Sequence, residues 1–144
     1  MANVFDVAAY ILGVRGTMTA MKLQKLVYYS QAWSLVWDEE PLFKEKIEAW
    51  ANGPMVRDLY EAHRGMFQVT EADFSEGKSK NLTKVQRQTI DKVLEFYGDK
   101  PSQWLSDLTH MEAPWKDARA GLPDGARSDR EISIASIAEF YGSL

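Results

Sequence analysis

The feature that most constrains the fold of this chain is a helix-like stretch with almost no polar face. Residues 22–37, KLQKLVYYSQAWSLVW, carry no charge after Lys25 and contain four aromatic rings. Two adjacent rows at helical spacing are formed by Leu23, Leu26, Val27, Ser30, Trp33 and Trp37 and by Gln24, Tyr28, Gln31 and Leu35. Because a helix that is apolar on all sides is buried at the centre of its domain, we expect this one, capped by Thr19 and ended by Asp38, to be the central element. A second interpretation has its second row reach an exposed groove through Tyr28, Gln31 and Leu35.

The other segments predict a mainly α fold with little β structure. Helical patterns follow Asn3, Pro54 at a first helical position, the capping box of Thr83 and Gln86, Pro101, Pro114 and Ser133. Residues 47–51 and 67–70 have strand patterns, and we expect them to pair as a small ribbon. The chain is therefore expected to form a single compact helical domain over residues 1–144. Six or seven helices would surround the central apolar helix, with a small two- or three-stranded β element.

Composition narrows the class of protein. The chain has 144 residues, 17 Lys and Arg against 21 Asp and Glu, and no cysteine, which excludes disulfides and thiolate chemistry. Its basic residues are scattered, whereas nucleic-acid binders gather them on one face. The N-terminal stretch has no basic leader, and no segment approaches the ~20 apolar residues of a membrane span. We expect a cytoplasmic protein that binds neither a membrane nor nucleic acid directly.

Residues that could carry catalysis are few. The segment LTHMEAPW places His110 two residues from Glu112, and a histidine–carboxylate pair can transfer protons. The sequence has no G-x-S-x-G nucleophile motif, no H-E-x-x-H metal pair and no P-loop. A histidine near a helix C-terminus commonly bonds the unpaired carbonyls there. We therefore expect His110 to be structural, with no catalytic, cofactor-binding or metal site and no enzymatic activity.

Four segments, taken in order, resemble one known family. MKLQKLVYYSQAW, PLFKEKIEAWANGP, VRDLYEAHRG and LTHMEAPWKDAR are similar to the Panacea domain family, which includes SocA-like antitoxins and phage-associated proteins of the GepA type. The resemblance runs from about Lys22 to Arg119, and residues 132–141 are similar to the family's closing helix. The triplet Met55-Val56-Arg57 departs from the family pattern, which is closer to Val-Val-Pro.

The resemblance implies an antitoxin that neutralises a cognate toxin by direct protein contact, the toxin being encoded by an adjacent gene. Alternatives are a phage- or prophage-associated protein that binds another host factor, an adaptor that delivers a partner to a protease, and an enzyme that uses His110 and Glu112. Because tryptophan, tyrosine and arginine dominate interface hot spots, we expect the partner to contact Trp50, Asn52, Gly53, Pro54, Arg57, Tyr60 and Trp115. The alternative for Tyr60 is that it packs against Trp50 in the core. The expected structural core includes Leu23, Leu26, Val27, Trp33, Trp37 and His110.

Overall fold

The computed structural model describes residues 2–144 and is mainly α-helical, as the sequence predicts. Its α-helices are α1 (Val4–Arg15), α2 (Ala20–Trp37), α3 (Arg57–His63), α4 (Lys84–Tyr97), α5 (Ser102–Met111), α6 (Ala113–Ala118) and α7 (Ile134–Gly142). The short strands are β1 (Met18–Thr19), β2 (Ile47–Trp50), β3 (Gly53–Val56) and β4 (Gln68–Val69), and two 3₁₀ segments are η1 (Glu71–Phe74) and η2 (Ser79–Asn81). No helix within residues 2–144 is long and apolar enough to cross a membrane.

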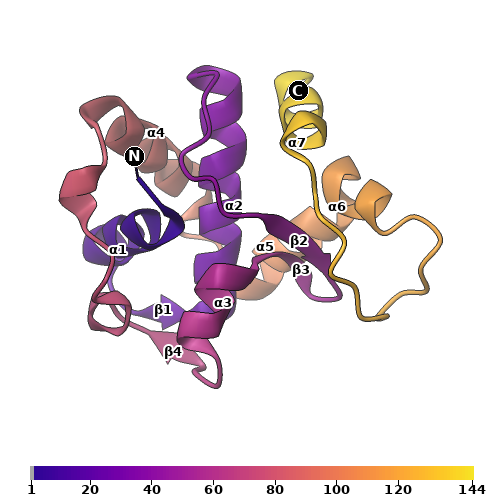
Figure 1. The fold of residues 1–144 in the computed structure, drawn as a ribbon, viewed down its shortest axis with the longest axis horizontal. Coiled ribbons are helices and arrows are strands. Elements are labelled where there is room, and N and C mark those ends of the chain that lie inside the picture. Colours follow the sequence, from indigo (N-terminus) through magenta and orange to yellow (C-terminus); the bar gives the residue numbers. More distant parts are fainter. Residues whose placement is uncertain (1) are drawn as a thin grey trace.

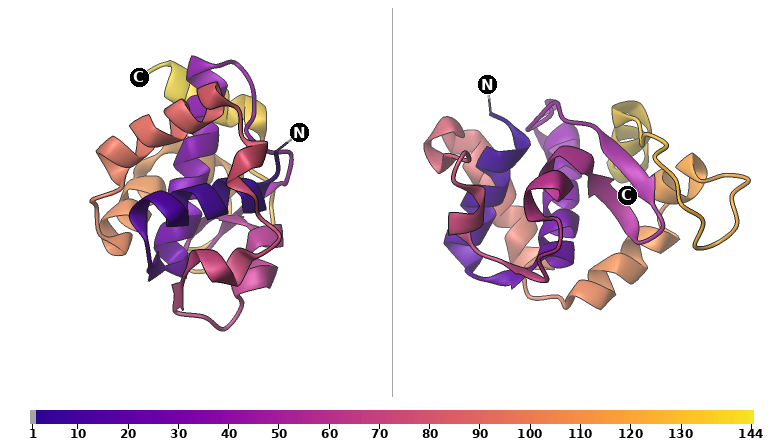
Figure 2. Two further views of the ribbon diagram at one scale, coloured as in Figure 1. Left: turned by 90° about the vertical axis from the view of Figure 1, so that its left-hand side faces the viewer. Right: turned by 60° about the horizontal axis from the view of Figure 1, so that its bottom comes forward.

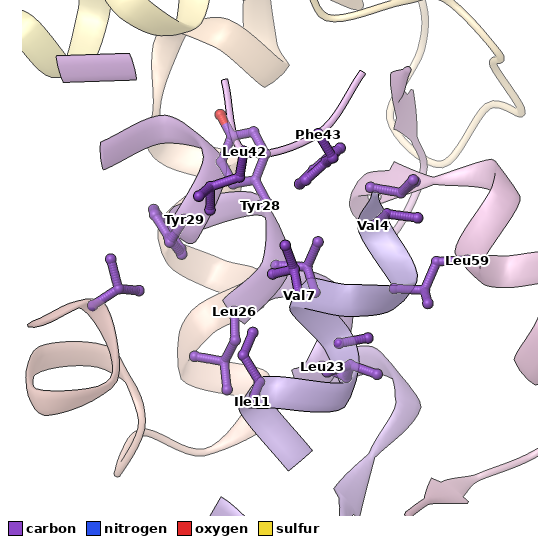
Figure 3. Packing of buried hydrophobic residues seen from close by; sticks show 14 of the residues in the cluster. Val4, Val7, Ile11, Leu23, Leu26, Tyr28, Tyr29, Leu42, Phe43 and Leu59 are labelled. Carbon is purple, nitrogen blue, oxygen red and sulfur yellow. The ribbon is translucent and has the colours of Figure 1, made fainter. Parts of the chain in front are cut away.

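Helix α2 is the central element of the fold. It stands between α1 and α4 on one side and α6 and α7 on the other (Figure 1), and the β2–β3 hairpin and α5 pack against it as well. Figure 3 shows side chains of α1, such as Val7 and Ile11, beside Leu23 and Leu26 of α2. Tyr28 of the second row is also buried. The interpretation in which this row reaches an exposed groove is therefore wrong, because α2 is covered on both rows.

Two buried glutamines let α2 pair with the backbone of the segments packed on it. The amide of Gln24 accepts from the Val56 N–H at 2.9 Å and donates to the Val56 carbonyl at 3.2 Å. The amide of Gln31 accepts from the Leu42 N–H at 2.7 Å and donates to the Phe43 carbonyl at 2.9 Å. The backbone of α2 is paired within the helix, so it cannot bond these main-chain groups of the neighbouring segments. The glutamine side chains supply the missing hydrogen bonds. This pairing explains how polar residues can occupy an otherwise apolar, buried helix.

The C-terminal turn of α2 departs from the expected core. Trp37 is 47% exposed and stacks on Trp33 with ring centroids 5.1 Å apart. Trp33 is only partly buried, and its indole N–H donates to the Tyr97 hydroxyl at 3.1 Å. Helical spacing predicts the direction in which a side chain points but not how far the covering elements extend along the helix. Trp37, the last residue of α2, is therefore wrongly assigned to the core.

The predicted helix caps are confirmed. The side chains of Asn3, Thr19, Thr83 and Ser133 each accept a hydrogen bond from a backbone N–H three residues later. Helix α1 runs to Arg15, and its C-cap is Gly16 with φ 79°. At these four positions, side-chain capping therefore marks where a helix begins.

The strands pair differently from the prediction. In the β2–β3 hairpin, Trp50 lies opposite Gly53 and Ala49 lies opposite Pro54, so Pro54 is in a strand and the following helix begins only at Arg57. Strand β4 pairs with β1, not with β2, because the N-terminal segment supplies a partner that local patterns do not reveal. Residues 130–132 run along the other edge of β2 through two backbone hydrogen bonds of 2.8 Å. The hairpin is thereby held between residues 130–132 and α2, and Asn52 at its tip is exposed.

Candidate functional site

A cleft of about 490 Å³ opens beside the tip of the β2–β3 hairpin. The hairpin lies between α3 and the orange loop that follows α6 (Figure 2, right), and each of these three segments contributes to the cleft. The lining side chains come from Trp50, Ala51, Asn52, Arg57, Tyr60, Glu61, Arg64, Arg127, Ser128 and Asp129. The cleft therefore combines aromatic rings with charges of both signs.

One wall of the cleft is built by stacked aromatic and cationic side chains. Trp50 meets Tyr60 edge to face, with ring centroids 4.8 Å apart. The Arg57 guanidinium lies 5.3 Å from the Trp50 ring centroid and 3.1 Å from Glu48. Its hydrogen bonds to Glu48 raise the pKa of Arg57 above its usual value. The Arg64 guanidinium lies over the Tyr60 ring, 5.9 Å from its centroid. The rings and guanidinium groups of this wall therefore lie in contact with one another.

The structure divides the predicted partner-binding residues into two groups. Trp50, Asn52, Arg57 and Tyr60 all line the cleft. Gly53, Pro54 and Trp115 are buried, which corrects their expected place on the surface. The two strand residues are covered because β3 packs against α2.

Trp115 is buried and contacts the hairpin from the side of α6. Its indole N–H donates to the Trp50 carbonyl at 2.8 Å. The cleft also contains Arg64 and Arg127, which sequence reasoning missed. They come from the end of α3 and from a distant loop, and only the fold brings them together.

A second, smaller hollow of about 200 Å³ lies on the other side of the hairpin tip. It shares Asn52 with the cleft and is otherwise lined by Met21 and Lys25 of α2 and by Ser102, Gln103 and Ser106 of α5. Lys25 is not among the site residues predicted from the sequence. The sequence feature that indicates it is a lysine within a helix that is apolar on all sides. A charge buried there must either be paired or bind a ligand.

Comparison with known proteins places this hairpin and both neighbouring helices in one family. Residues 23–116 match the family model described as antitoxin SocA-like, Panacea domain. The chain belongs to this family. The matched part of the Panacea domain begins in α2 and ends in α6, so it includes the hairpin, α3 and α5. No curated protein and no solved structure matches the chain.

In this Panacea domain, His110 and Glu112 have separate hydrogen-bond partners. The His110 ring nitrogens lie 2.6 Å from the Ser106 carbonyl oxygen and 3.1 Å from the Ala51 carbonyl oxygen, and the ring packs on Trp115. His110 thereby connects α5 to the hairpin tip. The described residues 2–144 contain no group of three or more acidic or histidine side chains placed to hold a metal.

Glu112 belongs to a buried cluster of tyrosines around α2. One carboxylate oxygen accepts from the Tyr29 hydroxyl at 2.6 Å and from the Tyr141 hydroxyl at 2.7 Å. The Tyr141 and Tyr28 hydroxyl oxygens lie 3.0 Å apart. Burial raises the pKa of Glu112, and the two hydrogen bonds oppose that shift. This cluster ties α7 and the start of α6 to α2.

Proposed function

We propose that this Panacea domain is an antitoxin that acts in the cytoplasm and neutralises a cognate toxin by direct contact at the cleft beside the hairpin tip. The observation that carries the proposal is the aromatic and arginine wall of that cleft, in a chain whose family is named for antitoxins. Tryptophan, tyrosine and arginine are the residues most enriched at interface hot spots. The domain thus acts by binding and not by catalysis.

The arrangement of Arg57 supports a binding role. Glu48 and the Trp50 ring already hold its guanidinium, so less side-chain freedom is lost when a partner docks. Arg64 and Arg127 at the rim are exposed and can form charge-assisted contacts with an acidic patch of the toxin. The aromatic wall would then supply affinity, and the rim charges would supply orientation and speed of encounter.

Co-expression with the product of the adjacent gene tests the proposal. Growth rescue and co-purification should both occur with the unchanged domain. The double substitution Arg64→Glu with Arg127→Glu should abolish both, since it reverses the charge of the rim. Arg87→Glu is the matched control, because Arg87 is an exposed arginine of α4, on the far side of the molecule from the hairpin. Equal rescue by the double variant and the control would contradict the proposed surface.

A further inference from the structure

We infer that the small hollow between Lys25 and the start of α5 is an anion pocket that receives one carboxylate side chain of the protein partner. The identity of the partner rests on the proposed function, whereas the anion preference of the pocket does not. Two independent positive groups, the Lys25 ammonium and the N-terminus of α5, meet in this hollow. Gly53 of the hairpin leaves room for the lysine.

The first positive group is the ammonium of Lys25. The side chain has 0% exposure, yet its Nζ is the one buried side-chain nitrogen or oxygen of residues 2–144 without a hydrogen-bond partner. Burial lowers the pKa of Lys25 to about 8. Buried charges in proteins are generally paired or bound to a ligand. Because Lys25 lines the hollow, a ligand there can supply the missing acceptor.

The second positive group is the N-terminus of α5. This helix begins at the same hollow, where Ser102 and Gln103 are lining residues. Pro101 occupies the N-cap position and provides no side-chain hydrogen bond. The first main-chain N–H of the helix to bond back is that of Leu105, which donates to the Pro101 carbonyl at 3.1 Å. The preceding N–H groups, at the positive end of the helix dipole, remain available to an anion.

Gly53 leaves room for the lysine. It has φ 117° within β3, and a Cβ added there would lie 2.7 Å from the Cε and 3.1 Å from the Nζ of Lys25. The hairpin backbone therefore passes the end of the lysine at a distance that a larger residue would not allow. Gly53, expected from the sequence to contact the partner itself, instead keeps the pocket open for Lys25.

The size and charge of the hollow favour a carboxylate. About 200 Å³ admits a single small group, and Lys25 is the one cation among its lining residues. One carboxylate oxygen can meet the ammonium while the other meets the N–H groups of α5. Since the hollow and the cleft share Asn52, a protein that covers the hairpin tip reaches both. These observations point to an aspartate or glutamate side chain of that protein.

Nuclear magnetic resonance titration of the ¹⁵N-labelled domain tests this assignment with N-acetylglutamate and N-acetylglutamine as probes. The acid should shift the amide resonances of residues 102–104 and raise the pKa of Lys25, because a nearby carboxylate favours the charged lysine. We expect the uncharged amide to bind at least tenfold more weakly. Lys25→Met should remove binding of the acid, and Lys22→Met should retain it as the control on the same helix.

Equal binding of acid and amide, or unchanged binding by folded Lys25→Met, would overturn the inference. Tighter binding of inorganic phosphate than of N-acetylglutamate would overturn the carboxylate assignment. The comparison of acid with amide uses the unchanged domain, so it decides the question even where a variant does not fold. No toxin enters this titration, so failure here and failure of neutralisation are separate results.

Discussion

Two buried ionisable groups, Lys25 within α2 and Glu112 packed against α2, differ in their hydrogen bonding. Glu112 accepts two tyrosine hydrogen bonds, of 2.6 Å and 2.7 Å. The Lys25 ammonium has no hydrogen-bond partner among residues 2–144. A buried carboxyl group that accepts such hydrogen bonds can serve the architecture alone. A buried charge without a partner lowers the stability of the folded chain, and such sites are common where proteins bind ligands. The comparison separates a structural cluster from a candidate binding pocket.

The largest effect is expected from breaking the structural cluster. Glu112→Ala leaves the hydroxyls of Tyr29 and Tyr141 without their acceptor and opens a cavity, so unfolding free energy should fall by about 4 kcal/mol. Urea denaturation measures this change. Glu112→Gln keeps an acceptor oxygen and should change stability by less than about 1 kcal/mol. A loss as large for the glutamine variant would show that the charge itself is required.

The pH dependence of stability should expose the unpaired lysine. Burial lowers the pKa of Lys25 from 10.5 to about 8, so above pH 8 the folded state releases a proton that the unfolded chain still holds. Unfolding free energy should therefore rise between pH 8 and 10.5. A shift of this size corresponds to about 3 kcal/mol. Denaturation at several pH values should show this rise in the unchanged domain. Its persistence in Lys25→Met would assign it to another group.

Replacing the lysine should stabilise the protein. Lys25→Met removes a buried, unpaired charge and retains much of the side-chain volume, so unfolding free energy at pH 7 should increase by about 2 kcal/mol. Thermal or urea denaturation measures the gain. A destabilised variant would mean that the Lys25 ammonium supports the fold, as Glu112 does.

The smallest effect is expected at Lys22, which lies on the same helix as Lys25 and serves as its control. Lys22 lies one turn before Lys25 and is only partly buried. Lys22→Met removes the same charge, yet its effect on stability at pH 7 should stay within about 0.5 kcal/mol. A gain equal to that of Lys25→Met would show that net charge, and not burial, explains both.

Much of the fold could be predicted because it depends on neighbouring residues. The caps at Asn3 and Thr83 and the central position of α2 follow from local hydrogen bonding and helical spacing. The exposure of Trp37 and the pairing of β4 with β1 depend on where distant segments end, and no local pattern contains that information.

In the candidate site, too, some features follow from nearby residues and others depend on distant segments of the chain. The residue types and positions of Trp50 and Tyr60 predict a binding role, and the structure places both in the wall of the cleft. Arg127 joins it through a loop far away in the chain. Lys25 is visible in the sequence, but only the fold shows that it is buried beside the N-terminus of α5 without a partner.

The most direct test is the affinity of the domain for the adjacent gene product, measured by calorimetry for the unchanged domain and for Lys25→Met. If the role of Lys25 is to bind the partner, Lys25→Met should be more stable than the unchanged domain. It should also bind the partner at least tenfold more weakly, a loss of about 1.4 kcal/mol in binding free energy. Lys22→Met should bind like the unchanged domain. A folded Lys25→Met protein that binds its partner with unchanged affinity would contradict the assignment of this pocket.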